Sequence, residues 1–331
     1  MITAPATGER DFIAAPDDPA IDIEMAAAVR KHAELIRQDG GPAEGMIENR
    51  AQHERLAPYW NEGAPALAEV SNLTVDRRGG GIPARLYRPV RERVPVLIYL
   101  HGGGWCRGSI ETADCTCRHL ADESGFAVLS LGYRLAPEHP YPAALEDTLA
   151  ALDWLRTEGE SHSLDTTRMF MGGGSAGANL SLVAALRCRD EGRIPPVGLL
   201  LFYGAYQCFD FGNASHSAFG DGRYGLSTER MMNYLTHYVP SGMHVTDPGI
   251  SPLKAASVAG LPPAWFGIAE LDVLRDEQLA MSARILEEGG EAEIHLYRGL
   301  THGFGARTRM VSRAVAALGD AARFMQRVAG R

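Results

Sequence analysis

A serine lies in a glycine-rich turn at residues 173–177, and this turn is compatible with two kinds of chemistry. The run Gly-Gly-Ser-Ala-Gly fits G-x-S-x-G, in which a sharp turn between a strand and a helix exposes a nucleophilic serine, here Ser175. Gly172, Gly174 and Gly177 also fit G-x-G-x-x-G, in which the backbone approaches the pyrophosphate of a dinucleotide. The first interpretation predicts a hydrolase, and the second predicts a protein that binds a nicotinamide or flavin cofactor.

The dinucleotide interpretation makes two demands that this chain does not meet. The glycine turn should open the first strand–helix–strand unit, and an acid should end the following strand to bind the ribose. Here at least two strand patterns precede the turn, and Asp190 and Glu191 come before the next strand pattern. That strand pattern ends in Tyr203-Gly204, without an acid. We therefore expect no cofactor.

The hydrolase interpretation requires two partners for the serine, because its hydroxyl barely ionises at neutral pH. An imidazole must take the proton, and a carboxylate must orient that imidazole. Where G-x-S-x-G presents the nucleophile between a strand and a helix, the three groups follow in the order Ser, acid, His, each on a loop at the C-terminal end of a strand. Asp272 comes just after the strand pattern at 264–270, and His302 follows the one at 292–297. We predict that Ser175, Asp272 and His302 form a catalytic triad.

Other acids and histidines near these positions suit the roles less well. Asp276 falls inside the next helix pattern, and Glu270 at the strand end is expected to bond to the backbone. His295 lies within a strand pattern, where an imidazole is usually a half-buried structural side chain.

Acyl transfer also builds negative charge on the carbonyl oxygen, and a second glycine run is placed to receive it. The residues His101-Gly-Gly-Gly-Trp105 follow the apolar strand pattern at 94–100. Consecutive glycines let backbone N–H groups approach an oxygen where a Cβ would intrude, and the N–H of Ala176, after the nucleophile, is a further donor. We expect His101 to hold this loop in shape. The glycines in 77–83 lack this context, and we expect a flexible loop there.

The elements that must position these groups alternate along the chain. Helical spacing marks residues 22–38, and strands and helices then alternate from about Val70. Such alternation predicts a mostly parallel sheet covered by helices on both faces. One interval, 205–242, has no strand pattern, and we expect a helix there near 227–238 with Ser227 as its cap. Further strands are expected at 94–100, 126–133, 168–172, 197–203, 264–270 and 292–297, and further helices at 144–156, 176–190, 275–288 and 311–328.

Four longer motifs of the chain occur together: HGGGW at 101–105, GYRLAPEHPYPAALED at 132–147, DPGISPLKAASVAGLPP at 247–263 and AELDVLRDE at 269–277. With these motifs the chain, from about Val70 to Phe304, resembles the hormone-sensitive lipase family of bacterial esterases. The resemblance implies an eight-stranded α/β-hydrolase core with a helical cap, the triad above, and the amides of Gly103, Gly104 and Ala176 as an oxyanion hole. The implied division is a cap segment at 1–66, a catalytic core at 67–204 and 243–331, and a cap insertion at 205–242.

One residue departs from the family pattern. Family members usually carry Asp or Thr just before the nucleophile, where the side chain braces the turn, and this chain has Gly174. The rigidity of the turn and the substrate preference are therefore open at this point.

These features predict a cofactor-independent carboxylester hydrolase that acts on short- to medium-chain acyl esters through an acyl-enzyme. The same groups can cleave amides, formamides or carbamates, so an amidase or arylformamidase is the alternative. A non-catalytic, ligand-binding member of the family is a further alternative, against which the presence of His302 argues.

The substrate itself is poorly specified by the sequence. Aromatic side chains predict an apolar pocket, although they suit packing of the cap against the core equally well. The sequence has no cluster of basic residues that would suggest an anionic substrate. The candidate substrate-binding residues are Trp105, Phe209, Phe211, Tyr224 and Phe304.

Composition excludes several classes of partner and compartment. The net charge of −9 argues against nucleic acid. The start of the chain lacks the features of a secretory signal, and no apolar stretch reaches the roughly 18 residues that span a bilayer. Five cysteines without zinc spacing predict reduced, buried thiols and no metal site. We expect a cytoplasmic protein, and the family resemblance makes a homodimer possible.

Overall fold

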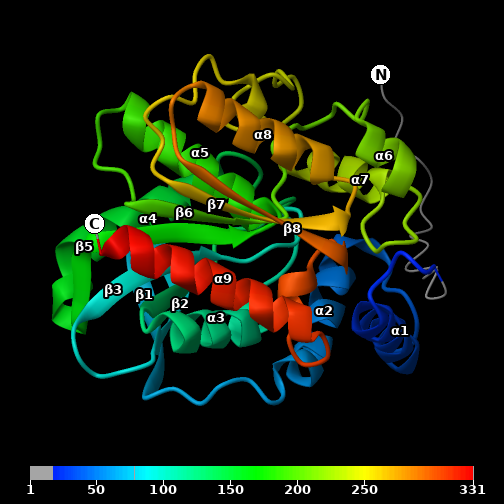
Figure 1. Ribbon diagram of the computed structural model, residues 1–331, viewed down its shortest axis with the longest axis horizontal. Coiled ribbons are helices and arrows are strands. Elements are labelled where there is room, and N and C mark those ends of the chain that lie inside the picture. Colours follow the sequence, from blue (N-terminus) through cyan, green and yellow to red (C-terminus); the bar gives the residue numbers. More distant parts are fainter. Residues whose placement is uncertain (1–17, 78, 331) are drawn as a thin grey trace.

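A computed structural model describes residues 18–77 and 79–330, and its centre is one eight-stranded sheet (Figure 1). The strand order is β1-β2-β4-β3-β5-β6-β7-β8, with β1 and β2 antiparallel to their neighbours and the others parallel. This confirms the expected eight-stranded, mostly parallel α/β sheet. The strands are β1 Glu69–Arg77, β2 Gly80–Arg88, β3 Val94–Leu100, β4 Ala127–Leu131, β5 Leu164–Gly174, β6 Gly198–Phe202, β7 Ala264–Leu271 and β8 Ala292–Thr301.

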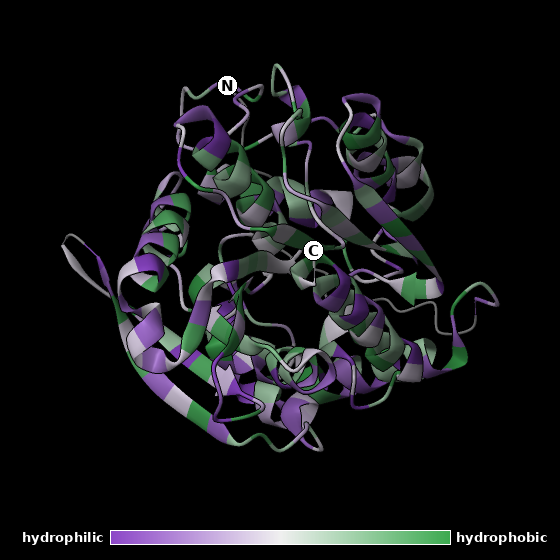
Figure 2. Cartoon of the chain, turned by 60° about the vertical axis from the view of Figure 1, so that its left-hand side comes forward, coloured by the Kyte–Doolittle hydropathy of each residue, from purple (hydrophilic) through white to green (hydrophobic). Residues whose placement is uncertain are grey.

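Helices cover both faces of this sheet. In Figure 1, α3 and α9 lie side by side on one face, and α5 and α8 lie on the other. Figure 2 shows polar and apolar bands on the same helices, as expected where one side packs on the sheet and the other meets water. The helices are α1 Ile23–Gln38, α2 Gly45–Asn61, α3 Ile110–Ser124, α4 Ala143–Glu158, α5 Ala176–Asp190, α6 Ala214–Phe219, α7 Thr228–Tyr238, α8 Arg275–Glu287 and α9 Ser312–Ala329, with short 3₁₀ turns η1 Gly159–His162, η2 Pro252–Lys254 and η3 Phe304–Ala306.

The core is divided by the sheet into two apolar clusters, and β3 illustrates how. Its Val96 and Ile98 side chains join the cluster with α4, α5 and α8. Its Leu97 and Tyr99 join the cluster with α3 and α9 on the opposite face. Successive side chains of a strand point to opposite faces, so a strand buried on both faces has a nearly continuous apolar sequence. For this reason unbroken apolar runs in the sequence predict the central strands.

The expectation of a flexible loop at 77–83 is wrong. Arg77 ends β1, and residues 80–83 already belong to β2, so the glycines form the turn of an edge hairpin and the start of its second strand. Gly79 and Gly80 have φ angles of 86° and 142°, which a residue with a Cβ rarely adopts. The glycine run therefore serves a tight antiparallel turn.

Helices α1, α2, α6 and α7 gather at the end of the sheet where the parallel strands terminate (Figure 1). Arg50 of α2 attaches this group to the core: its guanidinium donates to the Cys106 and Ala136 carbonyl oxygens at 3.0 Å each and pairs with Glu138. As expected, Ser227 caps α7, where its side-chain oxygen accepts from the N–H of Arg230. The group thus lies over the ends of the strands.

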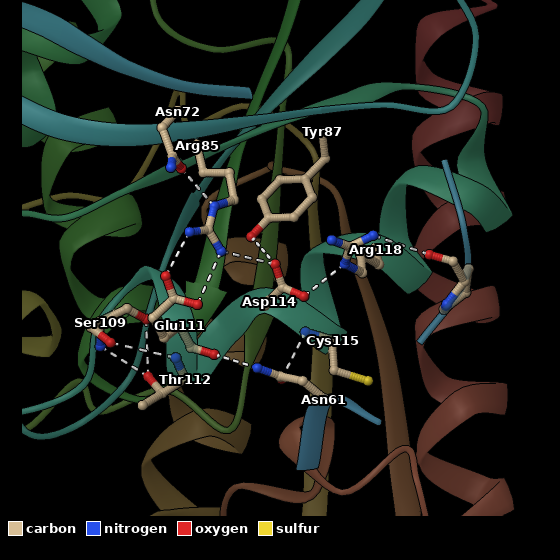
Figure 3. Close-up of polar contacts among 11 residues, drawn as sticks. Asn61, Asn72, Arg85, Tyr87, Ser109, Glu111, Thr112, Asp114, Cys115 and Arg118 are labelled. Atoms are coloured by element: carbon tan, nitrogen blue, oxygen red, sulfur yellow. Dashed lines mark hydrogen bonds and ion pairs between the residues drawn. The ribbon is translucent and has the colours of Figure 1, made fainter. Parts of the chain in front are cut away.

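Helix α3 is fixed between this group and the sheet by the polar contacts in Figure 3. The Asp114 carboxylate accepts from the Tyr87 hydroxyl at 2.8 Å and pairs with Arg85 and Arg118. Asn61, the last residue of α2, donates to the Glu111 carbonyl and accepts from the N–H of Cys115. These contacts set the position of the first turns of α3.

The cysteines are all buried and unpaired, as the sequence predicts. Within the described residues, we find no helix with the length and apolar character needed to cross a membrane.

Candidate active site

Ser175 lies at the junction of β5 and α5, in a backbone conformation that is rare for a residue with a side chain. Its φ is 56° and its ψ is −117°, and its N–H donates to the carbonyl of Phe202 at 2.9 Å. Residues held in such conformations store of order 1–3 kcal/mol of strain, which the surrounding structure must offset. The turn presents the Ser175 hydroxyl at the end of the sheet, as G-x-S-x-G predicts.

The neighbouring Gly177 explains why the turn can be so tight. A Cβ on Gly177 would lie 1.9 Å from the carbonyl oxygen of Leu100, the last residue of β3. Only glycine permits this approach, which brings the first turn of α5 against the end of β3. Ser175 therefore lies beside the loop that follows β3.

His302 and Asp272 extend a hydrogen-bonded chain from Ser175. Nε2 of His302 is 2.9 Å from Oγ of Ser175, and its Nδ1 is 2.8 Å from Oδ2 of Asp272. Asp272 is 1% exposed, and its Oδ1 accepts from the N–H of Leu274 at 2.9 Å. Asp272 and His302 follow the adjacent parallel strands β7 and β8, so the structure brings together the three residues that the sequence singles out.

The other candidate acids and histidines lie elsewhere. Glu270 accepts from the N–H of Gly299 at 2.8 Å, as expected. Asp276 is in the first turn of α8 and accepts from the N–H of Ser215. His295 is in β8 and pairs with Glu293 at 2.7 Å. Each side chain has a structural partner outside the chain of hydrogen bonds that ends at Ser175.

The glycine loop after β3 lies against Ser175. Gly102, Gly103 and Gly104 line the same cavity as the serine, and a Cβ on Gly102 would be 3.4 Å from the Cβ of Ser175. The φ angles of Gly103 and Gly104, 125° and 61°, are suited to glycine. Ala176, the third expected donor, is the first residue of α5.

His101 shapes this loop from within. It is 2% exposed, its ring stacks on Tyr133 with centroids 4.2 Å apart, and its Nδ1 is 2.9 Å from the Gly102 carbonyl oxygen. The Tyr133 hydroxyl in turn donates to the His101 carbonyl at 2.7 Å. Burial lowers the pKa of His101 to about 4, so the ring is neutral at pH 7. Its role is structural, as expected.

A cavity of about 200 Å³ opens in front of Ser175. Its walls come from α1 and α2, from the loop after β3, from the start of α3, from α7 and from the segment that follows β8. The apolar part of the wall includes Met25, Val29, Leu56, Ala57, Trp60, Leu226 and Met231.

The five aromatic residues expected to bind substrate are not among the residues that line this cavity. Trp105 is 1% exposed and stacks on Tyr238 at a centroid distance of 4.5 Å. Phe304 is fully buried against Tyr203 and Tyr297. The other three have the alternative role that the sequence left open, since they pack against neighbouring side chains: Phe209 and Phe211 against the core, and Tyr224 against Phe219.

The sequence also missed three arginines in the wall of the cavity. Arg107, Arg230 and Arg307 come from three segments that are far apart in the chain. No run of basic residues marks them, which is why the sequence suggested no anionic substrate. Arg107 lies in the loop after β3, and Arg307 lies in the segment after β8. Their positions after strand ends are the one signal in the sequence that places them near Ser175.

Comparison with known proteins gives consistent matches. A family described as having the alpha/beta hydrolase fold matches residues 97–306. The carboxylic ester hydrolase LipN of Mycobacterium tuberculosis is 34% identical over 299 residues, which are 87% of this chain and 76% of LipN. An acetyl esterase of Salmonella schwarzengrund is 32% identical over 86% of this chain and 88% of its own. Among solved structures, the ester-hydrolase EH1AB1 from the metagenome of Lake Arreo has a TM-score of 0.86 and 36% identity, and the match covers 94% of this chain and all of that one.

Proposed function

Because this chain belongs to the α/β-hydrolase-fold esterases of the hormone-sensitive lipase family, we propose that it is a serine carboxylester hydrolase with Ser175 as its nucleophile. The observation that carries the proposal is the continuous hydrogen-bonded chain from Asp272 through His302 to Ser175, beside a glycine loop and a cavity. A hydroxyl in this setting can be deprotonated as it attacks a carbonyl.

The proposed reaction begins with proton transfer. His302 takes the proton of Ser175 through Nε2 while Oγ attacks the ester carbonyl. The negative charge on the carbonyl oxygen is received by the amides of Gly103, Gly104 and Ala176. Loss of one such donor typically costs about 3–4 kcal/mol of transition-state stabilisation. The imidazolium then protonates the leaving alcohol, which departs as the acyl-enzyme forms.

Water completes the cycle. His302 removes a proton from water, the hydroxide attacks the acyl carbonyl, and Ser175 leaves with the proton returned by His302. Asp272 holds the imidazole in the tautomer that has a proton on Nδ1, and it stabilises the imidazolium in both half-reactions. Since Asp272 is buried, its charge acts on His302 with little screening by water.

The proposed substrates have short to medium acyl chains. The cavity of about 200 Å³ is smaller than the roughly 300–1,000 Å³ of pockets that hold drug-sized ligands. A series of p-nitrophenyl esters from acetate to palmitate tests this point. We expect kcat/KM to be highest at eight carbons or fewer; a maximum at palmitate would contradict it.

The assignment of the nucleophile is tested by Ser175→Ala. We expect p-nitrophenyl butyrate hydrolysis to fall by at least about 10⁴-fold, because the acyl-enzyme cannot form. Ser181→Ala is the matched control, since the Ser181 hydroxyl in α5 bonds to the carbonyl of Gly177 and is not in contact with His302. Wild-type turnover by Ser175→Ala would overturn the proposal.

A further inference from the structure

Three guanidinium groups share the cavity with Ser175. Arg107 lies in the loop after β3, Arg230 in the first turn of α7, and Arg307 just after η3. Arg230 is only 9% exposed, and the other two are partly buried. Arginines at the surface extend into water, whereas these three are turned toward the site that holds the nucleophile.

Contacts with α2 and α7 hold two of these groups in the wall. The Arg107 guanidinium donates to Oδ1 of Asn49 at 2.8 Å, and it lies 5.3 Å from the centre of the Tyr234 ring. The Arg307 guanidinium lies 4.1 Å from the centre of the Trp60 ring. Stacking on an aromatic face fixes the position of a guanidinium in the wall.

The electrostatic character of the wall is one-sided. Among residues 18–77 and 79–330, those lining the cavity include these three arginines and no Asp or Glu, although the whole chain has a net charge of −9. Arg107 and Arg230 make further interactions in the protein. In the whole chain acidic side chains outnumber basic ones, yet positive charge is concentrated around Ser175.

Burial first, and the arginine charges second, shift the pKa values of groups in this wall. Burial, with a smaller effect of Arg107, lowers the pKa of Arg307 to about 10. Burial and the nearby arginines also hold the pKa values of His32 and His53, in the same wall, well below their usual range. These histidines are therefore neutral at pH 7, and the positive charge resides on the arginines. A bound anion would offset the mutual repulsion of the three guanidinium groups.

We propose that the physiological substrate is an ester that carries a carboxylate, and that Arg107, Arg230 and Arg307 bind this carboxylate while the ester carbonyl lies at Ser175. This inference rests on the proposed esterase function and specifies its substrate class. A guanidinium can hold a carboxylate through two parallel N–H···O bonds, which fixes orientation as well as charge. The reaction is still hydrolysis: the acyl C–O bond breaks, the water oxygen joins the acyl group, and the alcohol leaves with a proton.

Matched pairs of esters test the proposal and show on which side of the ester the carboxylate lies. The first pair is p-nitrophenyl hydrogen glutarate against p-nitrophenyl valerate, with the charge on the acyl side. The second is 4-butyryloxybenzoate against phenyl butyrate, with the charge on the alcohol side. We expect kcat/KM to favour the charged member of at least one pair by about tenfold or more, and this preference to decrease as salt is added.

Variants assign the preference to the arginines. We expect Arg107→Gln, Arg230→Gln and Arg307→Gln each to lower the charged-to-neutral ratio of kcat/KM by about tenfold. Arg187→Gln is the control, because Arg187 is an exposed arginine of α5 that pairs with Glu191, and we expect it to leave the ratio unchanged. If the glutamine variants do not fold, inhibition of the wild-type enzyme supplies the same information. Glutarate should compete with p-nitrophenyl valerate, and glutaramide should not.

The outcomes separate this inference from the esterase proposal. Equal kcat/KM within both pairs, together with no inhibition by glutarate, would overturn the carboxylate subsite while leaving ester hydrolysis intact. A preference that survives all three substitutions would overturn its assignment to these arginines. If no ester is hydrolysed, the esterase proposal fails. In that case calorimetry tests the carboxylate subsite by itself. We expect glutarate to bind the wild-type protein and not to bind the arginine variants.

Discussion

The ring of Tyr203 occupies the space that a side chain at position 174 would need. A Cβ on Gly174 would lie 2.7 Å from Cε2 and 2.8 Å from the hydroxyl oxygen of Tyr203. The same ring meets the imidazole of His302 edge-on, with centroids 5.1 Å apart, and packs on Phe304. The space beside the residue before the nucleophile is thus filled by an aromatic ring that also contacts the proposed general base.

This relationship predicts a paired effect of substitution. Gly174→Asp should lower the free energy of unfolding by about 1–3 kcal/mol and reduce kcat, because the new side chain must displace Tyr203 and with it His302. The double variant Gly174→Asp/Tyr203→Ala should recover part of both losses. Thermal unfolding and p-nitrophenyl butyrate kinetics measure the two effects. Additive losses in the double variant would show that the two positions are not coupled.

Asp272 and Asp276 provide a second, matched comparison. Asp272→Asn should reduce kcat by about 10⁴-fold, because an amide in place of the carboxylate favours the wrong tautomer of His302. Asp276→Asn, four residues along, should keep kcat within about threefold, since Asp276 bonds to the N–H of Ser215 and not to His302. Steady-state kinetics of both variants test this. Similar losses in the two variants would contradict the assigned acid.

His101 predicts a loss of stability in acid. Burial lowers the pKa of His101 from 6.5 to about 4, so the folded state binds fewer protons than the unfolded state in this interval. Its stabilising contribution is fully present above pH 6.5 and is lost as the pH falls toward about 4, by about 3 kcal/mol in total. The buried His32 and His53 act in the same direction.

Urea unfolding at intervals between pH 7 and pH 4 measures this effect. The free energy of unfolding should fall less steeply with pH in His101→Gln than in the wild type, whatever the variant's stability at pH 7. His139→Gln, at an exposed position, is the control and should retain the wild-type slope. An unchanged slope in His101→Gln would indicate that the ring is not kept neutral by the fold.

The central strands and the proposed triad were predictable from the sequence for physical reasons. Strands buried on both faces have unbroken apolar sequences, and a parallel sheet brings its strand ends to one edge. Asp272 and His302 could therefore be placed near Ser175 from their positions just after strand patterns alone. Gly173 and Gly177 marked the turn because few other residues permit so close an approach to β3.

The walls of the cavity were not predictable in the same way. Arg107, Arg230 and Arg307 are separated by more than 70 residues from one another, and none of them lies in a run of basic residues. Their proximity depends on how α2 and α7 lie over the strand ends, which no local pattern encodes. Aromatic residues such as Trp105 and Phe304 suit both a pocket and a core, and only packing distinguishes the two.

The most direct test of the central claim is covalent labelling. The claim is that the fold makes the Ser175 hydroxyl nucleophilic through His302, and a fluorophosphonate probe reacts with such a serine by forming a P–O bond and releasing fluoride. We predict a single labelled serine, identified as Ser175 by peptide mass spectrometry, with labelling abolished in Ser175→Ala and greatly slowed in His302→Gln. Absence of labelling in the folded wild-type protein, or labelling of a different serine, would contradict the account.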